Sequence, residues 1–267
     1  MVVTFLTDFG LQDDFVGTCR GVIKRIAPDA DVIDITHGIE PQQVLQGALV
    51  LASTLPYMPE GVHLAVVDPG VGTERRALCL RSGDGRLYVG PDNGLLILAA
   101  ERLGGIAAAW QLTSPSFRLE PVSHTFHGRD VFAPAAAHLA RGVDPAELGP
   151  LLDVGGLVRL PLTAPVVAGD RIRAEVLLVD RFGNVRLNLT TEHLEEVGIA
   201  PGSRVELELT FERYFAVASR TFADVRPGDV ILYEDAYGNV AVAINGGNAA
   251  QMLSIKPGDQ LGIRILR

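Results

Sequence analysis

Hydrophobic patterns typical of strands and of helices alternate along the first 158 residues. Short apolar runs predict strands, and apolar residues at helical spacing predict helices. The predicted strands are 2–6, 30–35, 62–68, 77–81 and 86–90, and the predicted helices are 13–28, 41–59, 93–105 and 129–142. This alternation indicates an α/β domain with a mostly parallel central sheet, in which ligands bind at the carboxyl ends of the strands.

The pattern changes to period two after about residue 160. Four segments each begin at a glycine-containing turn and continue with alternating apolar residues: 168–180, 201–211, 227–235 and 257–266. Such spacing predicts an all-β antiparallel barrel-like domain. Two domains are therefore expected, 1–158 and 166–267, joined by a proline-containing linker.

Two similar stretches, "DRFGNV" at 180–185 and "DAYGNV" at 235–240, occur within the second domain. Both predict hairpin turns, in which the glycine adopts a positive φ. The first stretch can also present Phe182 and Asn184 to a planar ligand.

Composition narrows the class of protein. Hydrophobic residues make up 48% of the chain, charged residues 21%, and the formal net charge is −9. This acidic balance argues against a general binder of nucleic acid or of anionic membranes. The longest nearly apolar run, 47–58, is too short to span a bilayer, and the N-terminus has no basic segment of a signal peptide. With only two cysteines in unrelated contexts, the sequence predicts a cytoplasmic protein.

Three loops of the first half carry most of the polar chemistry: 7–15, 68–76 and 124–132. Asp8 and Asp68 each follow an apolar strand, where a lone carboxylate needs partners. Two neighbouring arginines, Arg75 and Arg76, point to opposite sides if the backbone is extended, so only one of them meets Asp68 easily. The residues alone leave open which one does.

Other acidic residues in these loops have simpler explanations. Asp13 or Asp14 can cap the following helix, and Asp130 can cap the helix that begins near it. Three functions remain open from residue types alone. These are a small-molecule hydrolase using Asp, Arg and His, a hydrolase in which Asp8, Asp13, Asp14 and Asp68 bind Mg²⁺, and a nucleoside-binding module without catalysis.

Five motifs together resemble one family, and they are "TDFGLQDDFVG", "DPGVGTERR", "PDNGLL", "HTFHGRDVFAP" and "DRFGNV". This family is the adenosine-forming S-adenosylmethionine (SAM) hydrolases, or SAM hydroxide adenosyltransferases, which are related to SAM-dependent fluorinases and chlorinases. The resemblance extends from about residue 3 to "NAAQMLSIKPGD" at 248–259. It implies hydrolysis of SAM to adenosine and L-methionine without a metal or other cofactor. It also implies a homotrimer with active sites between subunits.

The resemblance also assigns site residues. Asp68, Arg75 and His127 match the residues that hold the nucleophilic water, and Asp8 matches the carboxylate that binds the ribose hydroxyls. The remaining substrate-binding positions are Asp13 and Asp180 toward methionine and Phe182, Asn184, Asn248 and Ala249 around adenine.

The halide-using relatives differ at the nucleophile. They have a tyrosine and a threonine in the loop matching "DPGVG" and a serine in the loop matching "FHG", where this chain has Asp68, Val71 and Gly128. A carboxylate repels a halide and accepts a hydrogen bond from water, so these substitutions favour hydrolysis. A halogenase-like adenosyltransferase remains the alternative within the family.

Overall fold

The first unit of the chain, Met1–Leu160, is built on a six-stranded sheet with the order β2-β1-β3-β5-β4-β6. The computed structural model describes residues 1–209 and 212–266. The strands are β1 (Val2–Thr7), β2 (Asp31–Thr36), β3 (Gly61–Val66), β4 (Ala77–Ser82), β5 (Leu87–Pro91) and β6 (Ile106–Gln111). Only β4 runs antiparallel to its neighbours, so the predicted mostly parallel sheet is confirmed. The sequence patterns did not predict β6, because its alanines have low strand propensity.

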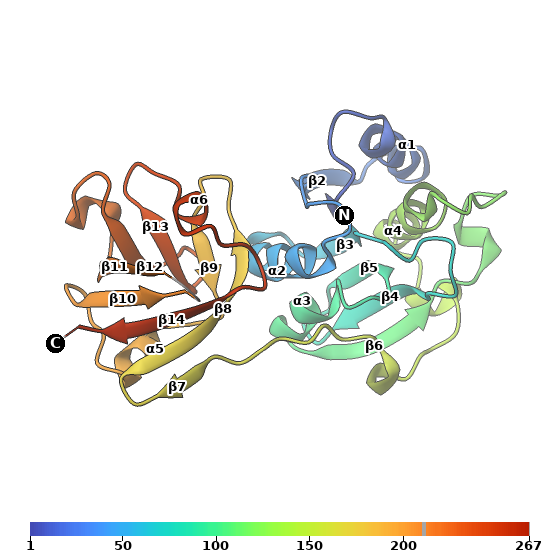
Figure 1. Cartoon of the computed structure of the whole chain (residues 1–267). Coiled ribbons are helices and arrows are strands. Elements are labelled where there is room, and N and C mark those ends of the chain that lie inside the picture. The colour runs from blue at the N-terminus through green and yellow to red at the C-terminus, as the bar shows by residue number, and fades with distance from the viewer. Residues whose placement is uncertain (210–211, 267) are drawn as a thin grey trace. The chain divides into compact units, whose positions relative to one another are not determined.

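Helices cover both faces of this sheet (Figure 1). They are α1 (Phe15–Ile26), α2 (Val44–Thr54), α3 (Ile97–Arg102) and α4 (Ala133–Ala140). One apolar cluster joins α1 and α4 to one face, and a second joins α2 and α3 to the other. The predicted helix at 129–142 begins differently from expectation, because Gly128–Phe132 forms a π-helical turn before α4.

Strand register brings two of the chemically rich loops to one edge of the sheet. Thr7 at the end of β1 lies beside Val66 at the end of the parallel strand β3. Asp8 and Asp68 follow these two residues. Both carboxylates therefore leave the sheet at its carboxyl edge, where α/β folds bind their ligands.

The second unit, Pro161–Arg267, is a closed barrel of seven mostly antiparallel strands. Its order is β14-β10-β11-β12-β13-β9-β8, and pairing of β14 with β8 closes it, while β7 extends β8 on the outside. The strands are β7 (Val166–Ala168), β8 (Arg171–Val179), β9 (Val185–Leu187), β10 (Arg204–Glu208), β11 (Arg213–Ala218), β12 (Val230–Glu234), β13 (Val240–Ile244) and β14 (Gln260–Ile265). Two short helices, α5 (Thr191–Glu196) and α6 (Ala249–Leu253), complete it.

The barrel agrees with the predicted fold class in all but one pairing, because β11 and β12 are parallel. The end of the predicted strand 201–211 lies outside the described residues. The two similar sequence stretches form the hairpin turns β8–β9 and β12–β13, as predicted. In each turn the aspartate accepts from two backbone N–H groups, and the glycine has a φ of 83° or 82°.

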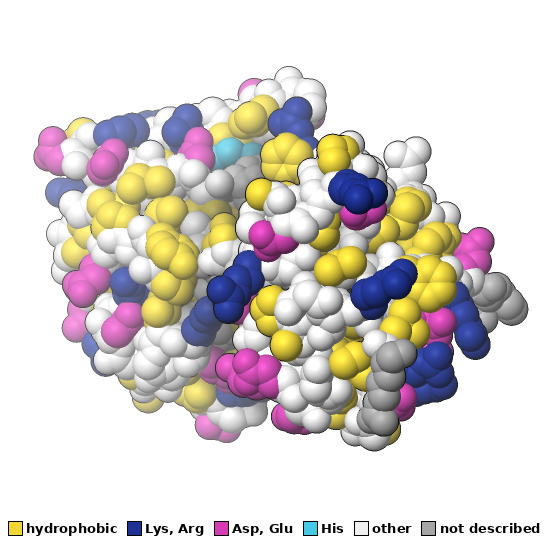
Figure 2. Space-filling view, turned by 90° about the vertical axis from the view of Figure 1, so that its left-hand side faces the viewer, with side chains coloured by type: hydrophobic (Ala, Val, Ile, Leu, Met, Phe, Trp, Pro, Cys, Tyr) yellow, Lys and Arg dark blue, Asp and Glu magenta, His cyan; other side chains and the backbone are white. Residues whose placement is uncertain are grey.

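Acidic and basic side chains are interspersed on the face shown in Figure 2. Within residues 1–209 and 212–266, no helix has the length and apolar character needed to cross a membrane.

Candidate active site

Arg75 joins Asp68 and His127 at the carboxyl edge of the first unit's sheet. Its Nη2 donates to Asp68 Oδ2 at 2.6 Å and to His127 Nδ1 at 2.9 Å. The side chains of Arg75 and Asp68 are only 8% and 6% exposed. The guanidinium also lies over the Phe132 ring, 5.2 Å from its centroid. The three residues matched to the water-binding group therefore form one connected, mostly buried cluster.

The neighbouring Arg76 turns to a different carboxylate. Its Nε donates to Asp92 Oδ2 at 2.7 Å and its Nη2 to the Gly156 carbonyl at 2.6 Å. The arginine that reaches Asp68 is thus Arg75. A two-point contact between Arg75 and Asp68 does not occur, because Nη1 donates to the Arg76 carbonyl at 3.1 Å and buried Nε has no partner among residues 1–209 and 212–266.

One carboxylate oxygen of Asp68 remains available. Oδ2 is bound to Arg75, whereas Oδ1 is buried and has no hydrogen-bond partner within the described chain. A buried, unpaired carboxylate oxygen is costly unless a donor such as water or a ligand occupies the space beside it. This oxygen is the strongest sign of a ligand position in the first unit.

Protonation states follow from burial and from the guanidinium. Burial raises the pKa of Asp68 above its usual 3.8, and the charge of Arg75 opposes that rise. Burial, with Arg75 beside it, lowers the pKa of His127 below 6.5. A guanidinium can only donate, so Nδ1 of His127 accepts and the neutral ring carries its proton on Nε2. At neutral pH, His127 is therefore a neutral donor at Nε2, and the ion pair with Arg75 favours the anionic form of Asp68.

The acidic residues of the loop 7–15 have separate partners or face solvent. Asp8 is half-buried and its Oδ2 accepts from Gln42 N at 2.8 Å, while Asp13 is exposed. Asp14 occupies the N-cap position of α1, but it accepts from the Thr18 hydroxyl and makes no side-chain cap. The four aspartates suggested for Mg²⁺ do not converge, and no metal-binding group of three or more such side chains occurs among the described residues.

Asp130 is a structural carboxylate and not the helix cap that the sequence allowed. It lies inside the π-helical turn, is 1% exposed, and binds Arg129 Nε at 2.6 Å and Ser123 N at 2.8 Å. These contacts fix the loop that precedes His127. The sequence does not show where the π-helical turn begins, so it could not distinguish this structural role of Asp130 from a helix cap.

A cluster of phenylalanines packs against the backbone next to His127. The rings of Phe9, Phe15 and Phe126 meet edge to face, with centroids 5.2–6.0 Å apart. A Cβ atom at Gly128 would lie 2.9 Å from Cζ of Phe9. The Phe9 ring thus occupies the space that a side chain at residue 128 would need. Sequence patterns gave these rings no role, because their contact joins loops far apart in the chain.

Substitution of Gly128 by alanine is expected to lower stability by about 1–3 kcal/mol, the usual cost of overpacking, and to lower activity by displacing His127. The added change Phe9→Leu is expected to recover much of both losses, because it removes the ring that the methyl group would strike. Denaturant unfolding and kcat measured for both single variants and the double variant test this coupling. If the losses of stability and of kcat in the double variant equal the sum of those in the single variants, the Phe9 ring does not restrict the size of the side chain at residue 128.

The residues of the second unit matched to adenine and methionine lie on two adjoining segments. Ala250 N donates to the Gly183 carbonyl at 2.9 Å, and a Cβ at Gly183 would collide with the Asn248 side chain. Asn248 caps α6 through a bond from Gln251 N at 2.8 Å, and Ala249 is buried at the start of that helix. This packing brings the turn at 180–185 beside α6.

The turn at 180–185 is rigid and presents an exposed ring. The Asp180 carboxylate accepts from Phe182 N, Asn184 N and Asn184 Nδ2 at 2.7–2.9 Å. Asp180 therefore organises the turn, and one N–H of the Asn184 amide is already used. Phe182 is 75% exposed, which suits a ring that stacks on a ligand or packs against another chain.

Comparisons with known proteins show which family the chain belongs to. The family model described as the SAM hydroxide adenosyltransferase N-terminal domain matches residues 3–149, and that of the C-terminal domain matches 174–262. The (R)-S-adenosyl-L-methionine hydrolase of Salinispora arenicola is 52% identical over 261 residues, which cover 98% of this chain and 97% of that protein. A more distant relative, a fluorinase from Nocardia brasiliensis, is 28% identical and covers 99% of this chain and 97% of that protein.

A solved structure has the same fold. An uncharacterized conserved protein from Thermotoga maritima has a TM-score of 0.92 at 36% identity, covering 98% of this chain and 99% of that one. The family models match both units, and the hydrolase relative matches nearly the whole length. The chain belongs to the SAM hydroxide adenosyltransferase family.

Proposed function

We propose that this protein hydrolyses SAM to adenosine and L-methionine by attack of water on C5′ of the substrate. The observation that carries the proposal is the buried, unpartnered Oδ1 of Asp68 in the cluster with Arg75 and His127. Its relatives named (R)-S-adenosyl-L-methionine hydrolase, 40–52% identical over nearly the whole chain, support it.

The reaction depends mainly on positioning. The sulfonium of SAM is a good leaving group, so water can displace methionine in line, forming the C5′–O bond as the C5′–S bond breaks. The water oxygen must lie about 3–3.5 Å from C5′ on the side opposite sulfur. Full proton transfer from water to Asp68 beforehand is unfavourable by about 16 kcal/mol, from pKa values of about 15.7 and 3.9. The proton therefore leaves as the C5′–O bond forms.

The cluster gives each residue a role in this step. Asp68 Oδ1 accepts a hydrogen bond from the water and takes its proton late. Arg75 holds Asp68 through Oδ2 and keeps Oδ1 free for water. His127, protonated on Nε2, serves as a second anchor and not as the first proton acceptor. The same neutral ring is held at Nδ1 by Arg75.

The remaining predicted residues bind the substrate. Asp8 takes the ribose hydroxyls, and Asp13 lies toward the methionine end. Asp180 also lies toward methionine, and Phe182, Asn184, Asn248 and Ala249 form the adenine side of the pocket in a homotrimer whose active sites lie between subunits. No metal or other cofactor takes part. We place the reaction in the cytoplasm, because Cys19 and Cys79 are buried free thiols suited to a reducing compartment.

A halogenase-like reaction is the second candidate, motivated by the likeness to fluorinases. The anionic Asp68 beside the nucleophile position argues against it, because a carboxylate repels chloride and fluoride. Purified protein incubated with SAM, with and without chloride or fluoride, decides between them. Adenosine plus methionine supports hydrolysis, a 5′-halogenated nucleoside supports halogenation, and tight adenosine binding without turnover indicates a binding module. A chelator-sensitive phosphatase activity would instead support a metal-dependent hydrolase.

A single turnover in ¹⁸O-labelled water is expected to place the label in the 5′-hydroxyl of adenosine. Direct attack by water has this result because the new C–O bond contains the solvent oxygen. If Asp68 attacked C5′ and the resulting ester were cleaved at its carbonyl, the label would enter the carboxylate. Mass spectrometry of adenosine and of the peptide containing Asp68 separates the two routes.

A further inference from the structure

The segment that follows β2 holds the loop containing Asp8 from several directions. Gly10 N donates to the His37 carbonyl at 2.8 Å, and Gln42 N donates to Asp8 Oδ2 at 2.8 Å. Gln42 adopts a φ of 66°, an uncommon conformation for a residue with a side chain. The backbone of residues 37–42 is therefore shaped to meet the Asp8 loop.

The His37 side chain makes a second connection to this loop. Its Nδ1 lies 2.9 Å from the Thr7 hydroxyl oxygen, which itself accepts from Phe9 N at 3.1 Å. In the ring tautomer protonated on Nε2, the nitrogen that faces Asp34, the Thr7 hydroxyl donates to Nδ1. The Thr7 hydroxyl also accepts from Phe9 N, and Asp8 is the residue between Thr7 and Phe9 in the chain.

The far side of the ring faces Asp34 but makes no hydrogen bond there among the described residues. Nε2 of His37 lies 3.3 Å from Asp34 Oδ1, and Asp34 Oδ2 pairs with Arg20 at 2.9 Å. The Phe5 ring meets the imidazole edge to face at 4.8 Å, and His37 is 5% exposed. A buried imidazole that contacts Thr7 through Nδ1 and packs against Phe5 can limit the movement of Thr7 and so of the Asp8 loop.

We propose that His37 is a positioning residue for substrate binding, which holds Asp8 in place for the ribose through Thr7 and the Gly10 contact. The inference rests on the proposed function and extends it to a side chain that does not touch the substrate. Loss of the imidazole releases the Thr7 hydroxyl and loosens the 7–10 turn. The weakened step is nucleoside binding, because the Asp68 cluster is held separately by Arg75.

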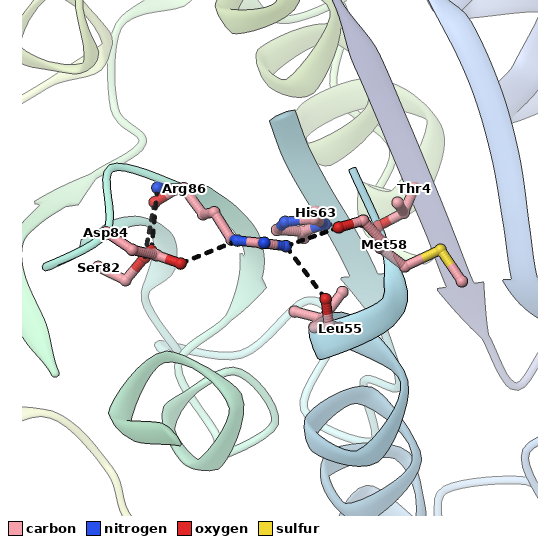
Figure 3. A network of polar contacts seen from close by, with 7 residues as sticks. All are labelled: Thr4, Leu55, Met58, His63, Ser82, Asp84 and Arg86. Atoms are coloured by element: carbon pink, nitrogen blue, oxygen red, sulfur yellow. Dashed lines mark hydrogen bonds and ion pairs between the residues drawn. The ribbon is translucent and has the colours of Figure 1, made fainter. Parts of the chain in front are cut away.

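The same sheet contains a matched control. His63 on β3 makes the same kind of contact with a threonine of β1, with Nδ1 2.9 Å from the Thr4 hydroxyl oxygen, and accepts from it in the tautomer protonated on Nε2. His63 is fully buried beside Tyr88, and Figure 3 shows it with Thr4 and with Arg86, which binds the carbonyls of Leu55 and Met58. Thr4 and His63 lie within their strands, away from the loops of the candidate site.

The test compares His37→Phe with His63→Phe. Each change keeps an aromatic ring and leaves one buried threonine hydroxyl without its acceptor. Calorimetry with adenosine, the product, reports the ribose site without turnover, and steady-state kinetics give KM and kcat for SAM. His37→Phe is expected to raise both the adenosine Kd and KM by about tenfold, with kcat changed much less. His63→Phe is expected to leave Kd and KM near the wild-type values.

Two further variants separate positioning from loss of fold. Thr7→Val should weaken adenosine binding in the same direction as His37→Phe. His37→Asn should recover part of the loss, because an amide oxygen can accept from Thr7 in place of Nδ1. Circular dichroism checks that each protein is folded at the assay temperature, and Thr7→Val supplies the test if His37→Phe does not fold.

The outcomes distinguish this inference from the proposed function. An active wild-type protein whose His37→Phe and Thr7→Val variants keep the wild-type Kd and KM would overturn the inference alone. So would an equal loss of adenosine binding in His63→Phe. A wild-type protein without SAM turnover would remove the proposed function and this inference with it.

Discussion

Replacement of Asp68 by asparagine is expected to lower kcat for SAM hydrolysis by about a thousandfold, within the usual range for loss of a general base. Asparagine has nearly the same shape as aspartate, but it places a hydrogen-bond donor beside the water where Asp68 has an acceptor. Because Arg75 can only donate, the amide oxygen of the new side chain turns toward Nη2. The amide N–H₂ then occupies the position of Oδ1 and offers the water a donor where it needs an acceptor.

Kinetics and substrate binding measured together check this prediction. The dissociation constant for SAM should change little, because Asp68 faces the water and not the recognised parts of the substrate. Asp92→Asn is the matched control, since Asp92 pairs with the adjacent Arg76 outside the cluster. Full activity in the Asp68 variant, or an equal loss in the Asp92 variant, would contradict the assigned role.

The sequence predicted the fold class well because hydrophobic periodicity is a local signal. The patterns predicted five strands of the first sheet and the change to short strands after residue 160. They missed β6, whose alanines favour helix over strand, and the parallel pairing of β11 with β12. Strand pairing depends on contacts between distant segments, which periodicity does not contain.

Only part of the candidate site could be predicted from the sequence. Residue types placed Asp68 at a strand end, but they left Arg75 and Arg76 equivalent. The choice depends on side-chain direction, which the loop sets by giving Arg76 a partner in Asp92. His37 was missed for a related reason, because its hydrogen bond to Thr7 joins two neighbouring strand ends. Family motifs supplied His127, which residue types alone did not distinguish from His124.

Replacement of Arg75 by methionine is expected to lower the free energy of unfolding by about 3–5 kcal/mol near pH 7, the usual cost of leaving one charge of a buried pair uncompensated. Asp68 and Arg75 are 6% and 8% exposed, so water screens little of the lost interaction. Activity should fall as well, because Asp68 and His127 lose the group that holds them both. Urea denaturation of the variant and the wild type between pH 5 and pH 8 measures the stability difference.

The pH dependence of that difference identifies its cause. Burial already raises the pKa of Asp68 in the wild type, and Arg75 is the main group that opposes this rise. Without Arg75 the folded-state pKa rises further above the unfolded value, so the folded variant takes up a proton at a higher pH than the unfolded chain. The loss of unfolding free energy in Arg75→Met is then largest at pH values above the folded-state pKa of Asp68. It becomes smaller as the pH falls toward the pKa of Asp68 in the unfolded chain. The double variant Asp68→Asn/Arg75→Met contains neither charge, so it should be more stable than the single variant at pH 7 and show no such dependence. A deficit in Arg75→Met that is constant with pH would mean that lost packing against Phe132, and not an unpaired carboxylate, destabilises the protein.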